Sequence, residues 1–466
     1  MSQIGSETDP LRVAIVGAGP AGFYTAERLF KEKSLHITVD MYDRLPTPFG
    51  LVRNGVAPDH LKIKSVTKVF DRLAKKPQFR FFGNVELGTD VTVEDLRNHY
   101  HQIVYSTGAQ TDRYLDIPGI ELKNSHPATE FVAWYNGHPD FRDYEFDLSQ
   151  ERVAVIGIGN VAVDVARILC RTRDELMETD IADYAMEQLV NSNVKEVVML
   201  GRRGPAQAAF TPPEAKELGE MAGADACVLP EEAELDPLSQ ASLADADRGT
   251  MRNIEIIKEL SQRARTDKPK KLTIRFLVSP TVLTGNGAGE VAGMRLVKNE
   301  LYQTESGTLR PRATEQFEDI PVGLVFRSIG YRGVPIPGVP FHERWGVILN
   351  EKGRVLHEES NEPVLGEYAS GWIKRGPSGV IGTNKPDAAE TAECMLADFA
   401  EGKTLNPAQP GLDAAAELVQ SRKPTFVSYE DWLRLDELEL AAGEAQGRPR
   451  IKFTEVGEML KALGKA

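Results

Sequence analysis

Short apolar segments alternate with helix-like segments along this chain, and several of the apolar segments run into glycine-rich turns. Residues 13–16 are apolar, with three β-branched side chains, and are followed at once by a glycine-rich turn. Such a run is typical of a strand buried in a parallel sheet. Residues 23–30 then have the pattern of a helix with one apolar side, and residues 36–42 that of a second strand. This alternation of strand and helix predicts an α/β class with parallel sheets.

The first glycine-rich turn has the pattern Gly17-x-Gly19-x-x-Gly22. In a dinucleotide-binding turn the first glycine makes the tight bend and the second lets the backbone approach a pyrophosphate. The third lets helix and strand pack closely. Asp43 ends the next strand, 21 residues after Gly22, near the spacing expected for a carboxylate that binds a ribose. We therefore predict that this half binds a dinucleotide with a free ribose hydroxyl, either FAD or NAD.

A second turn repeats the pattern as Gly157-x-Gly159-x-x-Ala162, after an apolar strand at 152–156. A helix is predicted from 163 to about 176, and a buried strand at 194–200. Two arginines, Arg202 and Arg203, follow this strand where the first half has an acid. Adjacent guanidinium groups suit the 2′-phosphate of NADP(H) rather than a free hydroxyl.

Two dinucleotide-binding halves with different endings indicate two cofactors, and a nicotinamide that reduces a flavin is the natural pairing. The strand that ends in Thr107-Gly108-Ala109 supports this interpretation, since that sequence recurs where flavoproteins with two dinucleotides cross between domains. Residues 368–384 predict a further strand, a glycine-rich loop and the start of a helix. Its Gly371-Trp372 pair replaces the Gly-Asp of many related flavoproteins, which excludes a simple copy of the glutathione-reductase pattern.

Residues 46–60, 159–167, 201–205 and 371–383 together closely resemble the adrenodoxin reductase family, in particular its bacterial ferredoxin–NADP+ reductases. The resemblance extends over about residues 10–460. It implies two three-layer, Rossmann-like domains, with the NADPH domain inserted in the FAD domain. The FAD domain is then expected at 1–109 and 330–466, the second part ending in a C-terminal arm, and the NADPH domain at 110–329.

The resemblance also implies roles for individual residues. FAD contacts are expected at Gly17, Gly19, Ala21, Gly22, Asp43 (where the family commonly has Glu), Leu51, Val85, Trp372, Gly379, Val380 and Ile381. NADPH contacts are expected at Arg113, Ile158, Gly159, Asn160, Val161, Arg202, Arg203, Glu214 and also Gly379, of which Arg113, Glu214 and Gly379 lie nearer the nicotinamide end. A polar cluster of His60, Asp164 and Glu214 is expected near the flavin and the nicotinamide, where it would relay protons and orient the carboxamide. Asn54 stands where Tyr or Phe is usual.

The composition of the chain excludes several classes of protein and of binding site. The 466 residues carry a formal net charge of −14, which argues against a general nucleic-acid binder because that role needs a positive surface. No apolar run approaches the ~18 residues that a membrane span requires. The first ten residues have neither the basic nor the apolar segment of a secretory signal, so we expect a cytoplasmic protein. The three cysteines, Cys170, Cys227 and Cys394, are too few and too distant for a disulfide framework, a zinc site or an iron–sulfur cluster, and we expect them to be buried packing.

Two basic segments stand out in this acidic chain. Residues 62–76 predict a helix with Lys64, Lys68 and Arg72 on one face and apolar residues from Ile63 onward on the other. Residues 248–271, which include Arg252, are also net positive. The functional interpretation is that both segments dock an acidic ferredoxin, and the alternative is that they are ordinary solvated faces. The acidic segment 217–247 is expected to be a peripheral loop or helical excursion, and the chain from 414 to be a packed helical arm.

Three functions stay open at this point. The first is NADPH:ferredoxin electron transfer. The second is another flavoenzyme, either a monooxygenase, which would incorporate oxygen into a substrate, or a disulfide reductase, against which the missing cysteine pair argues. The third is an electron-input subunit like the small subunit of glutamate synthase. That subunit has an N-terminal cysteine-rich segment, whereas only residues 2–11 precede the first strand here, without a cysteine.

Overall fold

Two sheets of mainly parallel strands organise the computed structural model, which describes residues 4–465. Each sheet belongs to a separate compact unit. Unit 1 comprises the chain up to Val56, His60–Thr111 and the chain from Gly330 onward; unit 2 comprises Ala57–Asp59 and Asp112–Ile329. The predicted α/β class is confirmed in both units.

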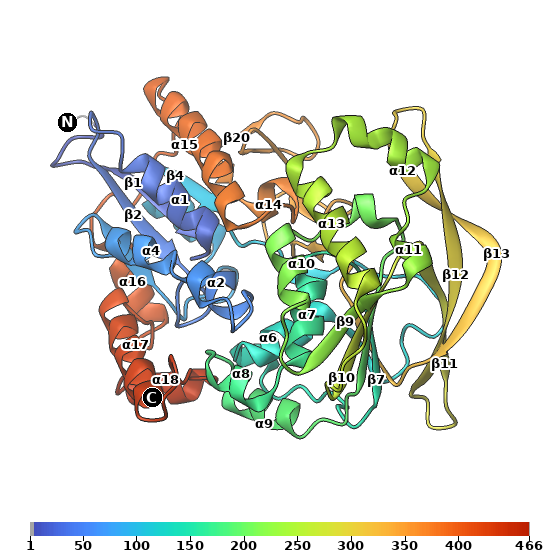
Figure 1. Cartoon of the computed structure of the whole chain (residues 1–466). Helices are drawn as coiled ribbons and strands as arrows, with labels where there is room; N and C mark the ends of the chain where they lie inside the picture. Colours follow the sequence, from blue (N-terminus) through green and yellow to red (C-terminus); the bar gives the residue numbers. More distant parts are fainter. Residues whose placement is uncertain (1–3, 466) are drawn as a thin grey trace. The chain divides into compact units, whose positions relative to one another are not determined.

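The sheet of unit 1 has seven strands in the order β18-β19-β20-β4-β1-β2-β3. Its parallel strands are β1 (Leu11–Val16), β2 (Ile37–Tyr42), β3 (Phe79–Phe82), β4 (Gln102–Tyr105) and β20 (Pro363–Ala369), and β19 (Arg354–Leu356) and β18 (Asn350–Glu351) extend it antiparallel. Figure 1 shows β20, from the last third of the chain, beside β4 from the first quarter. Strands from both chain ends therefore complete one sheet.

Helices cover this sheet and build its core. On one face α1 (Pro20–Leu29), α4 (Thr67–Ala74) and α15 (Asn384–Ala400) pack with the sheet, and Phe23 of α1 stacks on Phe70 of α4 with ring centroids 4.8 Å apart. The remaining elements of unit 1 are α2 (Leu51–Asn54), α3 (Leu61–Lys64), α5 (Val93–His99), β16 (Phe341–His342), β17 (Val347–Ile348), α14 (Trp372–Arg375), η4 (Ile381–Thr383), α16 (Ala414–Arg422), α17 (Tyr429–Glu444) and α18 (Val456–Ala462). The helical arm expected from residue 414 is confirmed, with Trp432 and Leu435 buried in the core.

Unit 2 has a six-stranded sheet in the order β6-β14-β7-β8-β10-β9 and a separate antiparallel sheet β11-β12-β13 (Figure 1). The six strands are β6 (Ser125–Pro127), β14 (Leu324–Arg327), β7 (Arg152–Ile156), β8 (Glu196–Leu200), β10 (Lys270–Arg275) and β9 (Ala224–Val228); the three are β11 (Val278–Gly285), β12 (Val291–Gln303) and β13 (Leu309–Pro321). Its helices are α6 (Ala128–Tyr135), η1 (Pro139–Phe141), α7 (Asn160–Cys170), α8 (Arg173–Met177), α9 (Asp183–Val190), η2 (Pro205–Gln207), α10 (Pro212–Leu218), α11 (Pro230–Ala233), α12 (Pro237–Ala241), η3 (Ser242–Asp245) and α13 (Arg248–Gln262). Two short strands, β5 (Thr111–Asp112) and β15 (Tyr331–Arg332), lie where the chain passes from one unit to the other.

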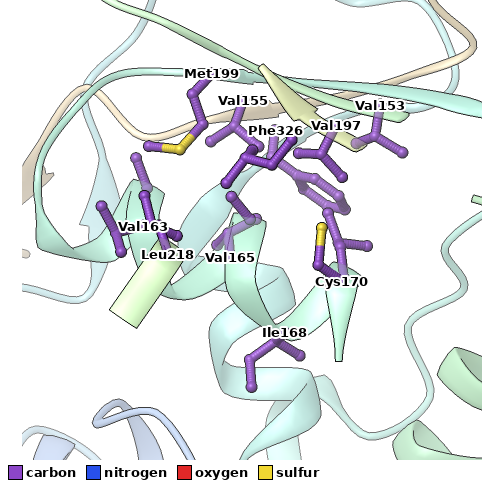
Figure 2. Close-up of a cluster of buried hydrophobic side chains, with 14 of the residues drawn as sticks. Val153, Val155, Val163, Val165, Ile168, Cys170, Val197, Met199, Leu218 and Phe326 are labelled. Atoms are coloured by element: carbon purple, nitrogen blue, oxygen red, sulfur yellow. The ribbon is translucent and has the colours of Figure 1, made fainter. Parts of the chain in front are cut away.

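Helix α7 is the centre of the core of unit 2. Figure 2 shows Val165 of this helix facing side chains from the neighbouring strands, including Phe326, with Val163 beside Leu218 and Ile168 on the side away from the strands. Cys170 lies in the same core and is fully buried, and burial raises the pKa of its thiol to about 12, so it is packing, as expected. Cys227 and Cys394 are only partly buried, contrary to expectation.

The basic segment 62–76 differs from its prediction. It forms two helices, α3 and α4, and between them the backbone bonds tighten to the i→i−3 type, as in Val66 N–H to the oxygen of Ile63. This change of pitch rotates α3 relative to α4, so in α3 Lys64 is buried and Ile63 is exposed, the reverse of the predicted faces. Lys68 and Arg72 are exposed as predicted.

The acidic segment 217–247 matches its prediction only in part. It contains the short helices α11, α12 and η3, but it also contributes strand β9, paired with β10 at one edge of the six-stranded sheet. Ala224, Ala226 and Val228 alternate into the core, and short side chains at these positions masked the strand signal. Among the described residues, no helix is long and apolar enough to cross a membrane.

Candidate functional site

The first glycine-rich turn of the sequence joins β1 to α1 in unit 1. Gly17 has φ +105°, and a Cβ at this position would lie 2.5 Å from the backbone oxygen of Ser106, so only glycine fits the bend. Helix α1 has no side-chain cap, and its first-turn N–H groups, among them those of Ala21 and Gly22, have no partner within the helix. A Cβ at Gly19 would meet nothing within 4 Å. The helix N-terminus therefore offers donors and space to a phosphate.

Asp43 holds this turn from the end of β2. Its Oδ2 accepts a hydrogen bond from the N–H of Ala18 at 2.8 Å, and its Oδ1 accepts one from Leu45 at 2.9 Å. Burial raises the pKa of Asp43, while both backbone donors act in the opposite direction. A carboxylate has about four acceptor sites, so the two that remain suit ribose hydroxyls. The turn and Asp43 fit the adenosine end of FAD.

Residues 371–381 form a second part of unit 1 that the sequence associated with a flavin. Trp372 opens the short helix α14, and its ring stacks on Tyr331 with centroids 5.5 Å apart. The loop from Gly376 leads to Val380, whose side chain is exposed, and to Ile381 at the start of η4. Of the two other predicted flavin contacts, Leu51 is exposed at the start of α2, and Val85 is buried with its N–H bonded to the backbone oxygen of Asp43.

The second glycine-rich turn joins β7 to α7 in unit 2. Gly159 precedes the helix, which again has no side-chain cap, so the first-turn N–H groups at Asn160 and Val161 are open to an anion. The side chain of Asn160 accepts a hydrogen bond from the N–H of Thr211 at 2.8 Å, and the oxygen of Ile158 accepts one from Ala209 at 3.1 Å. The turn thereby fixes the residues that precede α10, the helix that carries Glu214.

Arg202 and Arg203 follow β8 as predicted. Within the part of the chain that the structure describes, neither guanidinium has an acidic partner or a hydrogen-bond acceptor. Arg202 is exposed; burial, and then the neighbouring charge of Arg202, lower the pKa of Arg203. Two adjacent cations without a counter-charge are the inverse of the arrangement at Asp43, and they fit a bound phosphate.

A buried arginine, Arg167 of α7, gathers carboxylates in unit 2. It binds Asp59 through Nε at 2.7 Å, Asp164 through Nη2 at 2.8 Å and Glu214 through Nη1 at 3.2 Å, and Glu217 lies 3.4 Å away. Burial alone would lower the pKa of Arg167, but these carboxylates raise it well above its usual value. Arg167 is fully buried and stays cationic.

Within unit 2, the structure brings together Asp164 and Glu214, which the sequence proposed for proton handling. Asp164 and Glu214 share Arg167 in unit 2. His60 is buried at the position before helix α3 in unit 1. Arg167 and Asp59 could not be singled out from the sequence, although both lie within segments that carry the family resemblance, at 159–167 and 46–60. Arg113, predicted to contact the nicotinamide end, is exposed in unit 2.

Comparison with known proteins places the chain among pyridine-nucleotide flavoproteins. A family model described as pyridine nucleotide-disulphide oxidoreductase matches residues 11–201. The chain is 43% identical to the NADPH-ferredoxin reductase FprA of Mycobacterium leprae, over 96% of this chain and 97% of that protein. It is 42% identical to the mitochondrial NADPH:adrenodoxin oxidoreductase of Homo sapiens, over 97% of this chain and 92% of that protein. The solved structure of Mycobacterium tuberculosis FprA in complex with NADPH superimposes with a TM-score of 0.90, at 43% identity, covering 97% of this chain and 99% of that one.

Proposed function

Because the chain belongs to the adrenodoxin reductase family, we propose that it passes electrons from NADPH through FAD to a ferredoxin-type iron–sulfur protein. The observation that carries this function is the presence of two dinucleotide turns with opposite charge at their adenosine ends. Asp43 supplies an acceptor in unit 1, and Arg202 with Arg203 supplies uncompensated cations in unit 2. When bound, FAD supplies the chemistry that links a two-electron hydride donor to a one-electron acceptor.

Unit 1 is proposed as the FAD domain. The N–H groups of α1 would hold the pyrophosphate, and Asp43 the ribose hydroxyls. The residues proposed to surround the flavin ring are Leu51, Val85, Trp372, Gly379, Val380 and Ile381. Backbone N–H groups near Gly379 would face the polar edge of the ring and favour the more negative, reduced form.

Unit 2 is proposed as the NADPH domain. The N-terminus of α7, from Gly159 to Val161, would hold the pyrophosphate, and Arg202 with Arg203 the 2′-phosphate. Arg113 and Glu214 would contact the nicotinamide end. Arg167 fixes the carboxylates of Asp164 and Glu214 in one place, so both can orient a carboxamide or hold a proton. His60 is proposed as the third member of this proton-handling group.

The partner is proposed to approach the exposed basic residues Lys68 and Arg72 of α4, and Arg252 of α13. Lys64 leaves this set because it is buried. Arg252 pairs with Glu255 at 2.7 Å and with Glu259 at 3.9 Å, which offsets much of its charge. Each exposed contact contributes about 0–1 kcal/mol, so the combined field of Lys68 and Arg72 matters more than any single pair.

A stopped-flow experiment on the purified holoprotein tests the function. NADPH should bleach the flavin absorbance faster than NADH does, and oxidised ferredoxin should restore the absorbance. Charge reversal at Lys68 and Arg72 together should raise the KM for ferredoxin and weaken its salt dependence, while reduction of a small neutral acceptor stays unchanged. A protein that retains no flavin, or whose reduced flavin is not reoxidised by any ferredoxin, would refute the proposal.

A further inference from the structure

The turn that joins β20 to α14 is held by a carboxylate from a different element. Gly371 ends the strand with φ +79°, and a Cβ there would lie 2.4 Å from the Cβ of Ala21 in α1. On its other side, the N–H of Gly371 donates to Oδ2 of Asp387 at 2.6 Å. Asp387 lies in the first turn of α15, so the Gly371 backbone is fixed between α1 and α15.

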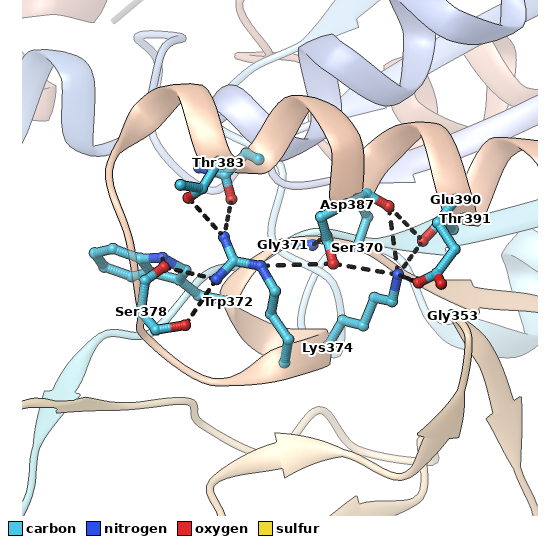
Figure 3. A network of polar contacts seen from close by, with 12 residues as sticks. Gly353, Ser370, Gly371, Trp372, Lys374, Ser378, Thr383, Asp387, Glu390 and Thr391 are labelled. Atoms are coloured by element: carbon cyan, nitrogen blue, oxygen red, sulfur yellow. Dashed lines mark hydrogen bonds and ion pairs between the residues drawn. The ribbon is translucent and has the colours of Figure 1, made fainter. Parts of the chain in front are cut away.

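Two cations on α14 neutralise the same carboxylate. Oδ1 of Asp387 lies 3.2 Å from Nζ of Lys374 and 3.5 Å from Nε of Arg375. Lys374 is buried, and its ammonium also binds Glu390 at 2.7 Å and Thr391 at 3.1 Å, as Figure 3 shows. With two cations and two carboxylates the cluster is neutral. Asp387 is the member of it that also bonds to the Gly371 backbone.

Arg375 extends this cluster to the loop that follows α14. Its guanidinium donates to the backbone oxygen of Ser378 at 2.6 Å and to Oδ1 of Asn384 at 3.0 Å. The same oxygen of Ser378 accepts a hydrogen bond from the indole of Trp372 at 3.2 Å (Figure 3). The strand end, the Trp372 ring and the loop are therefore linked through Arg375 to Asp387.

We propose that Asp387 is a positioning residue for the flavin ring: it orients the Gly371–Trp372 turn and, through Arg375, the loop that carries Gly379. This inference rests on the proposed function, which places the ring at these residues. Asp387 acts on the cofactor in two ways. Its hydrogen bond sets the direction of the Gly371 peptide, and its charge cancels a cation that would otherwise favour the reduced cofactor, which carries more negative charge than the oxidised one.

Matched variants separate these effects from general destabilisation. Asp387→Ala and Glu390→Ala each remove one carboxylate from Lys374, but Glu390 is half-exposed and has no contact with Gly371 among the described residues. We expect Asp387→Ala to raise the dissociation constant of FAD by roughly 10- to 100-fold, the loss of one charge-assisted hydrogen bond. Glu390→Ala should stay within about threefold, in the range of an exposed ion pair. Asp387→Asn should recover most of the affinity, because its amide oxygen can still accept from Gly371.

The flavin midpoint potential supplies a readout that a structural role would not move. Asp387→Asn should raise the potential and Glu390→Gln should leave it nearly unchanged, although both remove one negative charge. A tenfold larger loss of affinity for oxidised than for reduced FAD corresponds to about 30 mV. The midpoint potentials of Asp387→Asn and Glu390→Gln test the proposal even if Asp387→Ala does not fold. Equal affinities and potentials in the Asp387 and Glu390 variants would overturn the inference and leave the function intact, whereas a wild-type protein that binds no FAD would overturn the function itself.

Discussion

We predict that Arg203 slightly lowers the stability of the nucleotide-free protein and strongly stabilises its complex with NADPH. Its guanidinium has no partner among the described residues, and both burial and the charge of Arg202 lower its pKa. Arg203→Ala should therefore leave the stability of the nucleotide-free protein within about 0.5 kcal/mol of wild type, or raise it. A charge-assisted hydrogen bond to a phosphate contributes about 1.5–3 kcal/mol, so the same change should lower kcat/KM for NADPH roughly 10- to 100-fold. Arg202 is exposed, so Arg202→Ala should lower kcat/KM for NADPH less than Arg203→Ala does.

The assay compares NADPH and NADH on each variant and follows flavin reduction. The loss should appear in the KM for NADPH, with NADH turnover nearly level, because NADH has no 2′-phosphate. Arg263→Ala is the charge-matched control: Arg263 is also exposed in unit 2, but it bonds to the backbone oxygen of Gly219 and lies outside the proposed site. If Arg202→Ala with Arg203→Ala keeps the full preference for NADPH, or if the double variant unfolds at markedly lower denaturant, the assignment of these arginines is wrong.

Three further predictions concern buried charge. Arg167→Met leaves the carboxylates of Asp164 and Glu214 without their cation, and should lower the free energy of unfolding by about 3–5 kcal/mol in urea titrations, with Arg167→Lys in between. Burial and the charge of Arg12 lower the pKa of His101 to about 4, so the folded protein loses stability as the pH falls from about 6.5 to 4. Over this window, the difference in free energy of unfolding between wild type and His101→Asn should shrink by about 3 kcal/mol. A difference that stays constant with pH would contradict this prediction. Burial raises the pKa of Asp112 to about 7, so folding loses stability as the pH rises from about 4 to 7; Asp112→Asn should be more stable than wild type at pH 8, by up to about 4 kcal/mol, and the two should converge at pH 4.

The glycine turns could be predicted from the sequence because their signal is local. The strand, the turn and the helix that bind a pyrophosphate occupy about a dozen consecutive residues, and Asp43 follows within one more strand. The same holds for Arg202 and Arg203, which directly follow β8. A motif made of consecutive residues can be recognised without knowing how the rest of the chain packs.

Helix faces were harder to predict because they depend on a constant pitch. The prediction for 62–76 assumed a single α-helix, and a few i→i−3 bonds around Ser65 and Val66 were enough to exchange Ile63 and Lys64 between the buried and the exposed side. No residue in this stretch is a strong helix breaker, so the sequence carries no warning of the change.

The charge clusters could not be predicted because their members come from separate elements. Arg167 and Asp59 are 108 residues apart, and which carboxylate reaches the buried guanidinium depends on the packing of α7 against the segment at 57–59. Asp387 is only 16 residues from Gly371, but α14 and a loop lie between them, so neither helical nor strand periodicity relates the two. Periodicity identifies elements, and the contacts between elements have to be observed.

The position of β20 in the sheet has a consequence for biosynthesis. Strand β4 ends at Tyr105, and β20, which covers one of its edges, begins only at Pro363. While the ribosome makes the residues between them, β4 presents an unpaired, apolar edge, whereas most of unit 2 has already emerged as one continuous segment that can fold as a domain. Unit 2 therefore folds first, and the sheet of unit 1 is completed only when the last third of the chain has been made. A truncated or stalled product that ends before residue 363 would contain a folded unit 2 and an incomplete sheet in unit 1 with an unpaired edge. Such fragments should be the main source of aggregation during expression.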